Sequence, residues 1–175
     1  AGGPCSGKTT LLRALEHMGY SVRYESAQTL LERAPLGERE SMRIDPVAWQ
    51  RQVFEADIEM ISTIPTDELV ICDTSCVENL VFGSRVGLVF GPNTEAWMNR
   101  YRYCRVFFCE PLDDYEQTAV RRELHDVARM MSKKIEQRYQ SFGYDLIRIP
   151  ARSLEDRLAL IQRFIEKPMG GKGVD

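Results

Sequence analysis

The sequence predicts a doubly wound α/β fold, in which helices cover both faces of a parallel sheet. Short apolar runs of strand length alternate along the chain with longer stretches of helical period. A glycine-rich loop at residues 2–9 leads directly into the first helical stretch. The 175 residues suffice for one domain with a substantial core. We expect this domain to span residues 1–167, followed by a flexible tail at 168–175 that has nothing to pack against.

Composition excludes several classes of protein. With 43% hydrophobic and 28% charged residues, and no apolar run near the ~18 residues of a membrane span, the chain reads as soluble and globular. Its net charge of -3 gives no reason to expect nucleic-acid binding. The five cysteines form no CxxC pair, which indicates reduced thiols in a cytoplasmic protein. A zinc site at Cys72 and Cys76 is the alternative, but no second Cys or His pair completes it.

Most of the predicted helices have a start or stop signal. Gly19 ends the first one, and Asp45 with Pro46 caps the third. Ser153 and Asp156 resemble a capping box before the last helix. We expect helices at residues 8–18, 27–33, 45–61, 114–142 and 154–165. The fourth is long for a globular protein, so we expect a break in it near residues 121–125.

Apolar runs bounded by turn residues predict the strands. The run ELVIC, which ends in Asp73, is typical of a strand that is buried on both faces. We expect strands at residues 21–26, 68–72, 104–109 and 145–149. Residues 35–43 are polar and form the best candidate for a mobile loop, and residues 83–93 are rich in Gly and read as irregular. Four apolar residues in the third helix form a core stripe: Val47, Phe54, Ile58 and Ile61.

The strongest functional signal is the loop itself, GGPCSGKT, which matches G-x4-G-K-[ST]. Glycines allow successive backbone N–H groups to point at one phosphate, and the helix N-terminus adds positive potential. Lys8 reaches the terminal phosphates and Thr9 offers its hydroxyl to Mg²⁺. A merely structural turn would not need Lys8 and Thr9 together. We therefore expect ATP or GTP to be bound by Gly2, Gly3, Pro4, Cys5, Ser6, Gly7, Lys8, Thr9 and Thr10.

A loop of this kind follows a buried strand, yet only Ala1 stands before Gly2. A sheet without its middle strand would expose two unpaired edges. We therefore expect an apolar strand upstream of Gly2, which would be the first strand of the sheet.

Two carboxylates are candidates for the reacting end of the site. Asp73 follows a buried strand, where it can hold Mg²⁺ through water or orient an acceptor hydroxyl. The alternative is that Asp73 caps the next helix. Glu25 ends the strand SVRYES at the carboxyl edge of the sheet, where α/β folds bind ligands, and suits a base toward a hydroxyl. A solvated residue at a strand end is the alternative for Glu25.

Arginines on the long fourth helix could bracket phosphates. Arg122 and Arg129 are seven residues apart on one helix, so they can share a face and act on the phosphates as an internal arginine finger. The alternative is ordinary surface pairing with Glu123 and Asp126.

Several segments together resemble the NadR-like AAA domains, small P-loop proteins grouped with ribosylnicotinamide kinases and close in architecture to deoxynucleoside kinases. The resemblance runs from residue 1 to about residue 167. It is carried by GGPCSGKTTLLRALEHMGYSV, YESAQTLLE, ELVICDTS, VFFCEPL and RYQSFGYDLIRIPARSLEDR. The late pattern YxxxGYxxxxxP, which is formed by Tyr139, Gly143, Tyr144 and Pro150, is the most specific part.

This resemblance implies a kinase-like P-loop NTPase fold that binds ATP or GTP with Mg²⁺. It implies Gly7, Lys8 and Thr9 at the phosphates and magnesium, with Thr9 and Asp73 as the metal-holding pair. It also implies Glu25 and Asp73 facing a small hydroxyl acceptor, and Arg121 on a lid helix at the transferring phosphate. Arg122, from its helix spacing, is also expected to bind the nucleotide, and Arg152, after the last strand, is placed at the nucleotide base by analogy with P-loop kinases.

The function we expect is transfer of the γ-phosphate to a nucleoside-like hydroxyl acceptor, with Lys8, Asp73, Glu25 and Arg121 as catalytic residues. The alternative is a nucleotide-dependent switch that hydrolyses slowly and moves residues 83–93 between nucleotide states.

Overall fold

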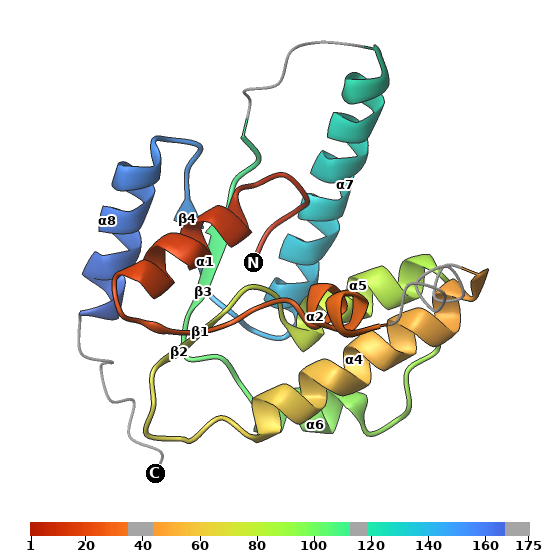
Figure 1. The fold of residues 1–175 in the computed structure, drawn as a ribbon. Coiled ribbons are helices and arrows are strands. Elements are labelled where there is room, and N and C mark those ends of the chain that lie inside the picture. The colour runs from red at the N-terminus through yellow and green to blue at the C-terminus, as the bar shows by residue number, and fades with distance from the viewer. Residues whose placement is uncertain (35–43, 113–118, 167–175) are drawn as a thin grey trace.

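The structure is a computed structural model that describes residues 1–34, 44–112 and 119–166, with only the backbone described at 119–125 (Figure 1). Helices and strands alternate along most of the chain. The helices are α1 (Lys8–His17), α2 (Ser26–Arg33), α4 (Pro46–Ser62), α5 (Cys76–Arg85), α6 (Thr94–Arg100), α7 (Ala119–Ser141) and α8 (Leu154–Ile165). The strands are β1 (Ser21–Arg23), β2 (Val70–Cys72), β3 (Val106–Cys109) and β4 (Leu146–Ile149).

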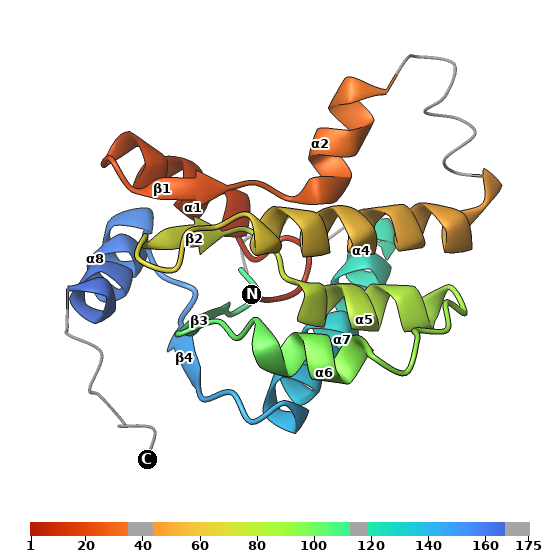
Figure 2. The same ribbon diagram turned by 90° about the horizontal axis from the view of Figure 1, so that it is seen from below.

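The elements form three layers, with the strands in the middle. Helices α1 and α8 cover one face, and α4, α5, α6 and α7 lie on the other (Figures 1 and 2). Each side has its own apolar core: Leu11, Leu15 and Ile161 belong to the first, and Phe54, Leu80 and Ile135 to the second. Helices on both faces of parallel strands are what the sequence predicts.

The strands pair in parallel, but as two separate pairs. Strand β1 pairs with β2, with Ser21 opposite Val70, and β3 pairs with β4, with Val106 opposite Leu146. The described strands therefore form two two-stranded sheets, and they do not form the continuous doubly wound sheet that we expected.

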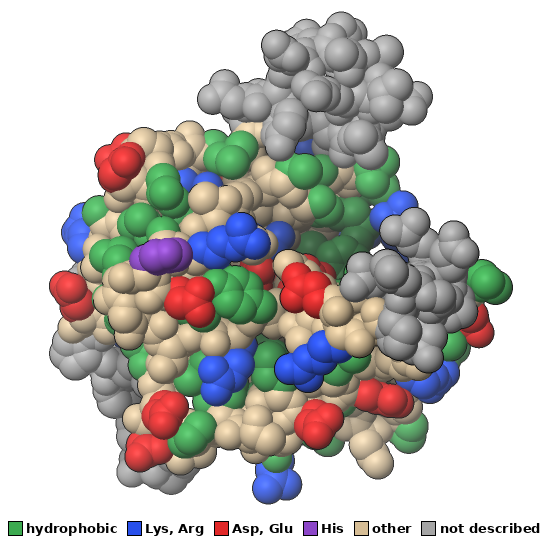
Figure 3. Space-filling model, in the orientation of Figure 1, with side chains coloured by type: hydrophobic (Ala, Val, Ile, Leu, Met, Phe, Trp, Pro, Cys, Tyr) green, Lys and Arg blue, Asp and Glu red, His purple; other side chains and the backbone are tan. Residues whose placement is uncertain are grey.

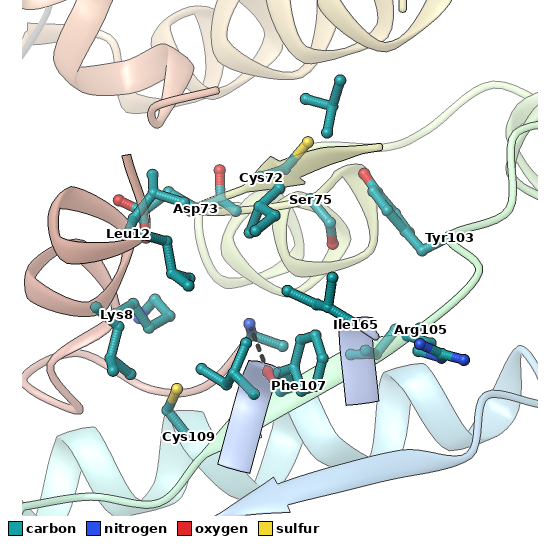
Figure 4. A pocket seen from close by; sticks show the side chains of 18 of the residues that line it. Lys8, Leu12, Cys72, Asp73, Ser75, Tyr103, Arg105, Phe107, Cys109 and Ile165 are labelled. Carbon is teal, nitrogen blue, oxygen red and sulfur yellow. Dashed lines mark hydrogen bonds between the residues drawn. The ribbon is translucent and has the colours of Figure 1, made fainter. Parts of the chain in front are cut away.

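Ala1 lies beside β3 and makes strand-like hydrogen bonds. Its amino group donates to the Phe107 oxygen at 3.0 Å, and the Cys109 N–H donates to the Ala1 oxygen at 2.9 Å. These two bonds have the pattern of a parallel pair. Between β2 and β3 the structure has a mostly apolar cavity of about 190 Å³ (Figure 4). The strand expected upstream of Gly2 would lie outside the sequence, so it stays an expectation.

Capping residues set the helix boundaries as predicted. The Asp45 carboxylate accepts from the Val47 and Ala48 N–H groups at 3.1 and 2.9 Å, which starts α4. The Ser153 hydroxyl accepts from the Asp156 N–H at 3.2 Å, which starts α8.

Three expectations about elements are wrong. The strand expected at 21–26 ends at Arg23, because Ser26 already begins α2. Residues 83–93 are not irregular throughout, since α5 continues to Arg85; the Ser75 hydroxyl caps α5 by accepting from the Glu78 N–H. The break expected near residues 121–125 is absent, and α7 is continuous from Ala119. The loop predicted at 35–43 and the tail at 168–175 lie outside the described residues.

The surface mixes both signs of charge. Figure 3 shows acidic and basic side chains interspersed with apolar ones over one face of the molecule. In the part of the chain that the structure describes, no helix is both long enough and apolar enough to cross a membrane.

Candidate functional site

The glycine-rich loop has the tight backbone that its sequence demands. Cys5 has φ of 60° and Gly7 has φ of 76°, in the region that side chains rarely adopt. The Ser6 hydroxyl donates to the Gly3 oxygen at 2.8 Å and closes the turn. A Cβ atom at Gly2 would lie 2.5 Å from the Cys109 oxygen, so only glycine fits there. Helix α1 begins directly after Gly7, so the unpaired N–H groups of its first turn belong to this loop.

Lys8 lies across the loop. Its Nζ atom donates to the Gly2 oxygen at 2.8 Å and to the Gly3 oxygen at 2.9 Å. A cation therefore lies on the loop that leads into a helix N-terminus, and both favour a phosphate group.

Thr9 and Asp73 come together from positions 64 apart in the chain. The Thr9 hydroxyl donates to Asp73 Oδ2 at 2.8 Å. The Asp73 N–H donates to the Arg23 oxygen at 2.9 Å, which extends the β1–β2 pairing and fixes the carboxylate beside α1. Figure 4 shows Asp73 and Lys8 on the α1 side of the pocket. Ser75 and not Asp73 caps α5, so the alternative role that we considered for Asp73 is taken by Ser75.

This pair fits a magnesium ion. Asp73 is 4% exposed, and its Oδ1 atom is buried without a hydrogen-bond partner among the described residues. Mg²⁺ prefers oxygen ligands and is usually held by one or two protein groups, with water and substrate phosphates completing its shell. Among the described residues, no group of three or more His, Cys, Asp or Glu side chains could hold a metal by itself, the Cys72 and Cys76 region included.

Glu25 lies at the start of α2, as its N-cap residue, and not at the end of a strand. Burial raises the pKa of Glu25, the negative charge of Asp73 raises it further, and Lys8 opposes both. Glu25 is therefore partly buried and within electrostatic range of Asp73 and Lys8. The structure brings these three predicted residues together, and the catalytic role of Glu25 stays a prediction.

A buried polar cluster next to Glu25 was missed by the sequence analysis. Asp57, on α4, is 0% exposed, accepts a hydrogen bond from the Asn79 amide and is also hydrogen bonded to Ser26. The Asn79 oxygen in turn accepts from the Gln50 amide at 3.1 Å. Burial raises the pKa of Asp57 to about 6. The sequence could have predicted the burial of Asp57, because this residue lies four residues after Val53 on the same face of α4.

The arginines divide into three groups. Arg121 and Arg122 lie in the first turn of α7, and their side chains are outside the described residues. Arg152 follows β4 in the loop where we expected it, with an exposed side chain. Arg157, to which the sequence analysis gave no role, is 4% exposed and donates from Nη2 to the Ser6 oxygen at 2.7 Å. Its position four residues before Ile161, on the buried face of α8, was the sequence signal that could have predicted its burial.

Comparison with known proteins identifies a family for this chain. A family model described as AAA domain matches residues 1–157. No curated protein and no solved structure matches the chain.

Proposed function

Because the chain belongs to the AAA domain family, a group of nucleotide-binding P-loop proteins, we propose that it is a small-molecule kinase. It transfers the γ-phosphate of ATP or GTP to a hydroxyl of a nucleoside-like acceptor, with Mg²⁺ as cofactor. The unit that does this is the domain at residues 1–167.

The observation that carries the proposal is the grouping of two carboxylates beside the phosphate loop. Asp73 is bonded to Thr9 and keeps one buried oxygen without a partner. Glu25 has a raised pKa and is in electrostatic range of Asp73 and Lys8. Phosphate binding alone needs no second carboxylate, whereas an acceptor hydroxyl needs a group that orients it and takes its proton.

Each residue then has a distinct role. Lys8 exchanges its backbone acceptors for phosphate oxygens, and the N–H groups at the start of α1 bind the same phosphates. Thr9 and Asp73 hold the magnesium ion, which when bound neutralises charge on the phosphates.

Glu25 accepts the proton of the acceptor hydroxyl. The acceptor oxygen forms a bond to the γ-phosphorus, and the bond from that phosphorus to the bridging oxygen breaks, releasing the nucleoside diphosphate. Arg121 contributes positive charge from α7 at the transferring group, while Arg122 and Arg152 contact the nucleotide.

The same proposal treats the two strand pairs as halves of one doubly wound sheet. Helices on both faces support this, and so do the strand-like bonds of Ala1 between the pairs.

The test is a transfer assay with the full chain, Mg²⁺, and either ATP or GTP. Nucleosides, including nicotinamide riboside, are offered one at a time, and water is the blank. We expect at least one acceptor to raise nucleoside diphosphate release above the blank and to appear as its monophosphate. Lys8→Ala, which loses the phosphate contact and no core contact, should abolish the signal. If no acceptor exceeds water while the wild-type protein still hydrolyses nucleotide, the switch is the better account.

A further inference from the structure

Arg157 is a buried cation that has no carboxylate partner among the residues that the structure describes. It lies on α8 with 4% of its surface exposed, and none of the described acidic side chains forms an ion pair with it. Its Nε atom is buried and has no hydrogen-bond partner among the described residues. An unpaired buried charge is costly, so a structural role alone gives no reason for a guanidinium here.

The guanidinium lies directly against the phosphate loop. Nη2 donates to the Ser6 oxygen at 2.7 Å. A Cβ atom at Gly7 would lie 2.8 Å from Nη1, which shows how closely this group approaches the backbone at the start of α1. The same Cβ atom would lie 3.2 Å from Leu112 Cδ1.

This contact sets the direction of a loop N–H group. The peptide unit between Ser6 and Gly7 is planar and trans, so its C=O and N–H point in opposite directions. Because the Ser6 oxygen points at Arg157, the Gly7 N–H points away from it. Holding the oxygen therefore also holds the N–H as a donor on the opposite side of the loop.

Three sources of positive potential lie at the loop, opposite the carboxylates of Asp73 and Glu25. Lys8 lies across the loop, α1 presents its N-terminus there, and Arg157 lies behind Gly7. A cation near a helix N-terminus is unfavourable unless an anion is bound between them. A bound polyphosphate would therefore relieve the electrostatic repulsion between Arg157, Lys8 and the N-terminus of α1.

We propose that Arg157 is a positioning residue of the phosphate site. It orients the Ser6–Gly7 peptide for anion binding and adds its charge to the attraction for a polyphosphate. The inference rests on the part of the proposed function that concerns phosphate binding, and it is independent of transfer to an acceptor.

The test uses inorganic triphosphate as the probe and the full chain as the protein, with affinity measured by calorimetry over a range of salt concentrations. Arg157→Met keeps most of the packing volume and removes the charge. Arg163→Met, at an exposed position of the same helix, is the matched control. We expect Arg157→Met to weaken binding about tenfold or more at low salt and to reduce the salt dependence, because it loses a charge-assisted contact to the loop. We expect the control to bind within twofold of the wild type.

If Arg157 only stabilised the packing of α8 against the loop, its replacement would lower thermal stability and leave triphosphate affinity unchanged. A folded Arg157→Met variant that binds within twofold of the wild type, with the same salt dependence, would therefore overturn the proposal.

If Arg157→Met does not fold, Arg157→Lys takes its place. Lysine keeps the positive charge but lacks the planar guanidinium with its several N–H donors. We therefore expect this variant to bind triphosphate more weakly, with the salt dependence of the wild type. An affinity equal to that of the wild type would contradict the positioning role of Arg157. A wild-type protein that binds triphosphate but phosphorylates no acceptor leaves this proposal standing and refutes the kinase. Absence of triphosphate binding by the wild type refutes both.

Discussion

Replacing Asp57 by Asn should remove a pH dependence of stability that originates next to Glu25. Asp57 is fully buried, and burial raises its pKa from 3.8 to about 6 in the folded protein. The folded state therefore holds this proton more tightly than the unfolded state. The stabilisation from that proton is fully present below the unfolded pKa and is lost as the pH rises through about 6.

The size of the effect follows from the shift. A change from 3.8 to about 6 is roughly two pKa units, each worth ~1.4 kcal/mol, so ionising Asp57 costs about 3 kcal/mol in full. About 2 kcal/mol of this falls between pH 4 and pH 7, because at pH 4 the carboxyl of the unfolded chain is already partly ionised. Asparagine does not ionise, and its oxygen can still accept from Ser26. The free energy of unfolding of Asp57→Asn, relative to the wild type, should therefore rise by about 2 kcal/mol from pH 4 to pH 7.

Urea unfolding at a series of pH values measures this difference directly. Glu59→Gln, at an exposed position of the same helix, is the control and should show no such trend. If the difference between Asp57→Asn and the wild type is the same at pH 4 and pH 7 within about 0.5 kcal/mol, the buried carboxylate is not ionising at the cost that its environment implies.

Three further predictions concern the loop and the metal. Cys5 is exposed within the loop, so iodoacetamide should label it in the free protein and a bound Mg-nucleotide should protect it; equal labelling with and without nucleotide counts against the binding mode. Gly7→Ala places a Cβ 2.8 Å from Arg157 Nη1 at a φ of 76°, so triphosphate affinity measured by calorimetry should fall at least tenfold, and an unchanged affinity would contradict the loop geometry. Asp73→Asn should raise the Mg²⁺ concentration needed for half-maximal transfer, whereas an unchanged requirement would remove Asp73 from the metal site.

Local signals predicted much of the fold. The caps at Asp45 and Ser153 and the glycine stop at Gly19 are set by backbone groups within a few residues, so sequence spacing finds them. Helix α5 was missed because its buried face carries Glu78 and Asn79, which hide the apolar period.

The tight backbone of the glycine-rich loop could be predicted because a single motif contains all of its residues. The bond between Thr9 and Asp73 joins two segments through the sheet, and sequence could place both only at the same edge. Glu25 was assigned to a strand end, although it begins a helix. Arg157 and Asp57 were missed because their roles depend on which tertiary neighbours bury them, which periodicity does not show.

The most direct test of the account is the rate of phosphate transfer to the best acceptor in Glu25→Gln. The control is Glu32→Gln, an exposed glutamate on the same helix. Glu25→Gln should lower transfer by about 10²-fold or more, the scale of general acid–base catalysis, with little change in nucleotide affinity. The control should transfer at the wild-type rate. Transfer by Glu25→Gln within twofold of the wild type would contradict the assignment of Glu25 as the base.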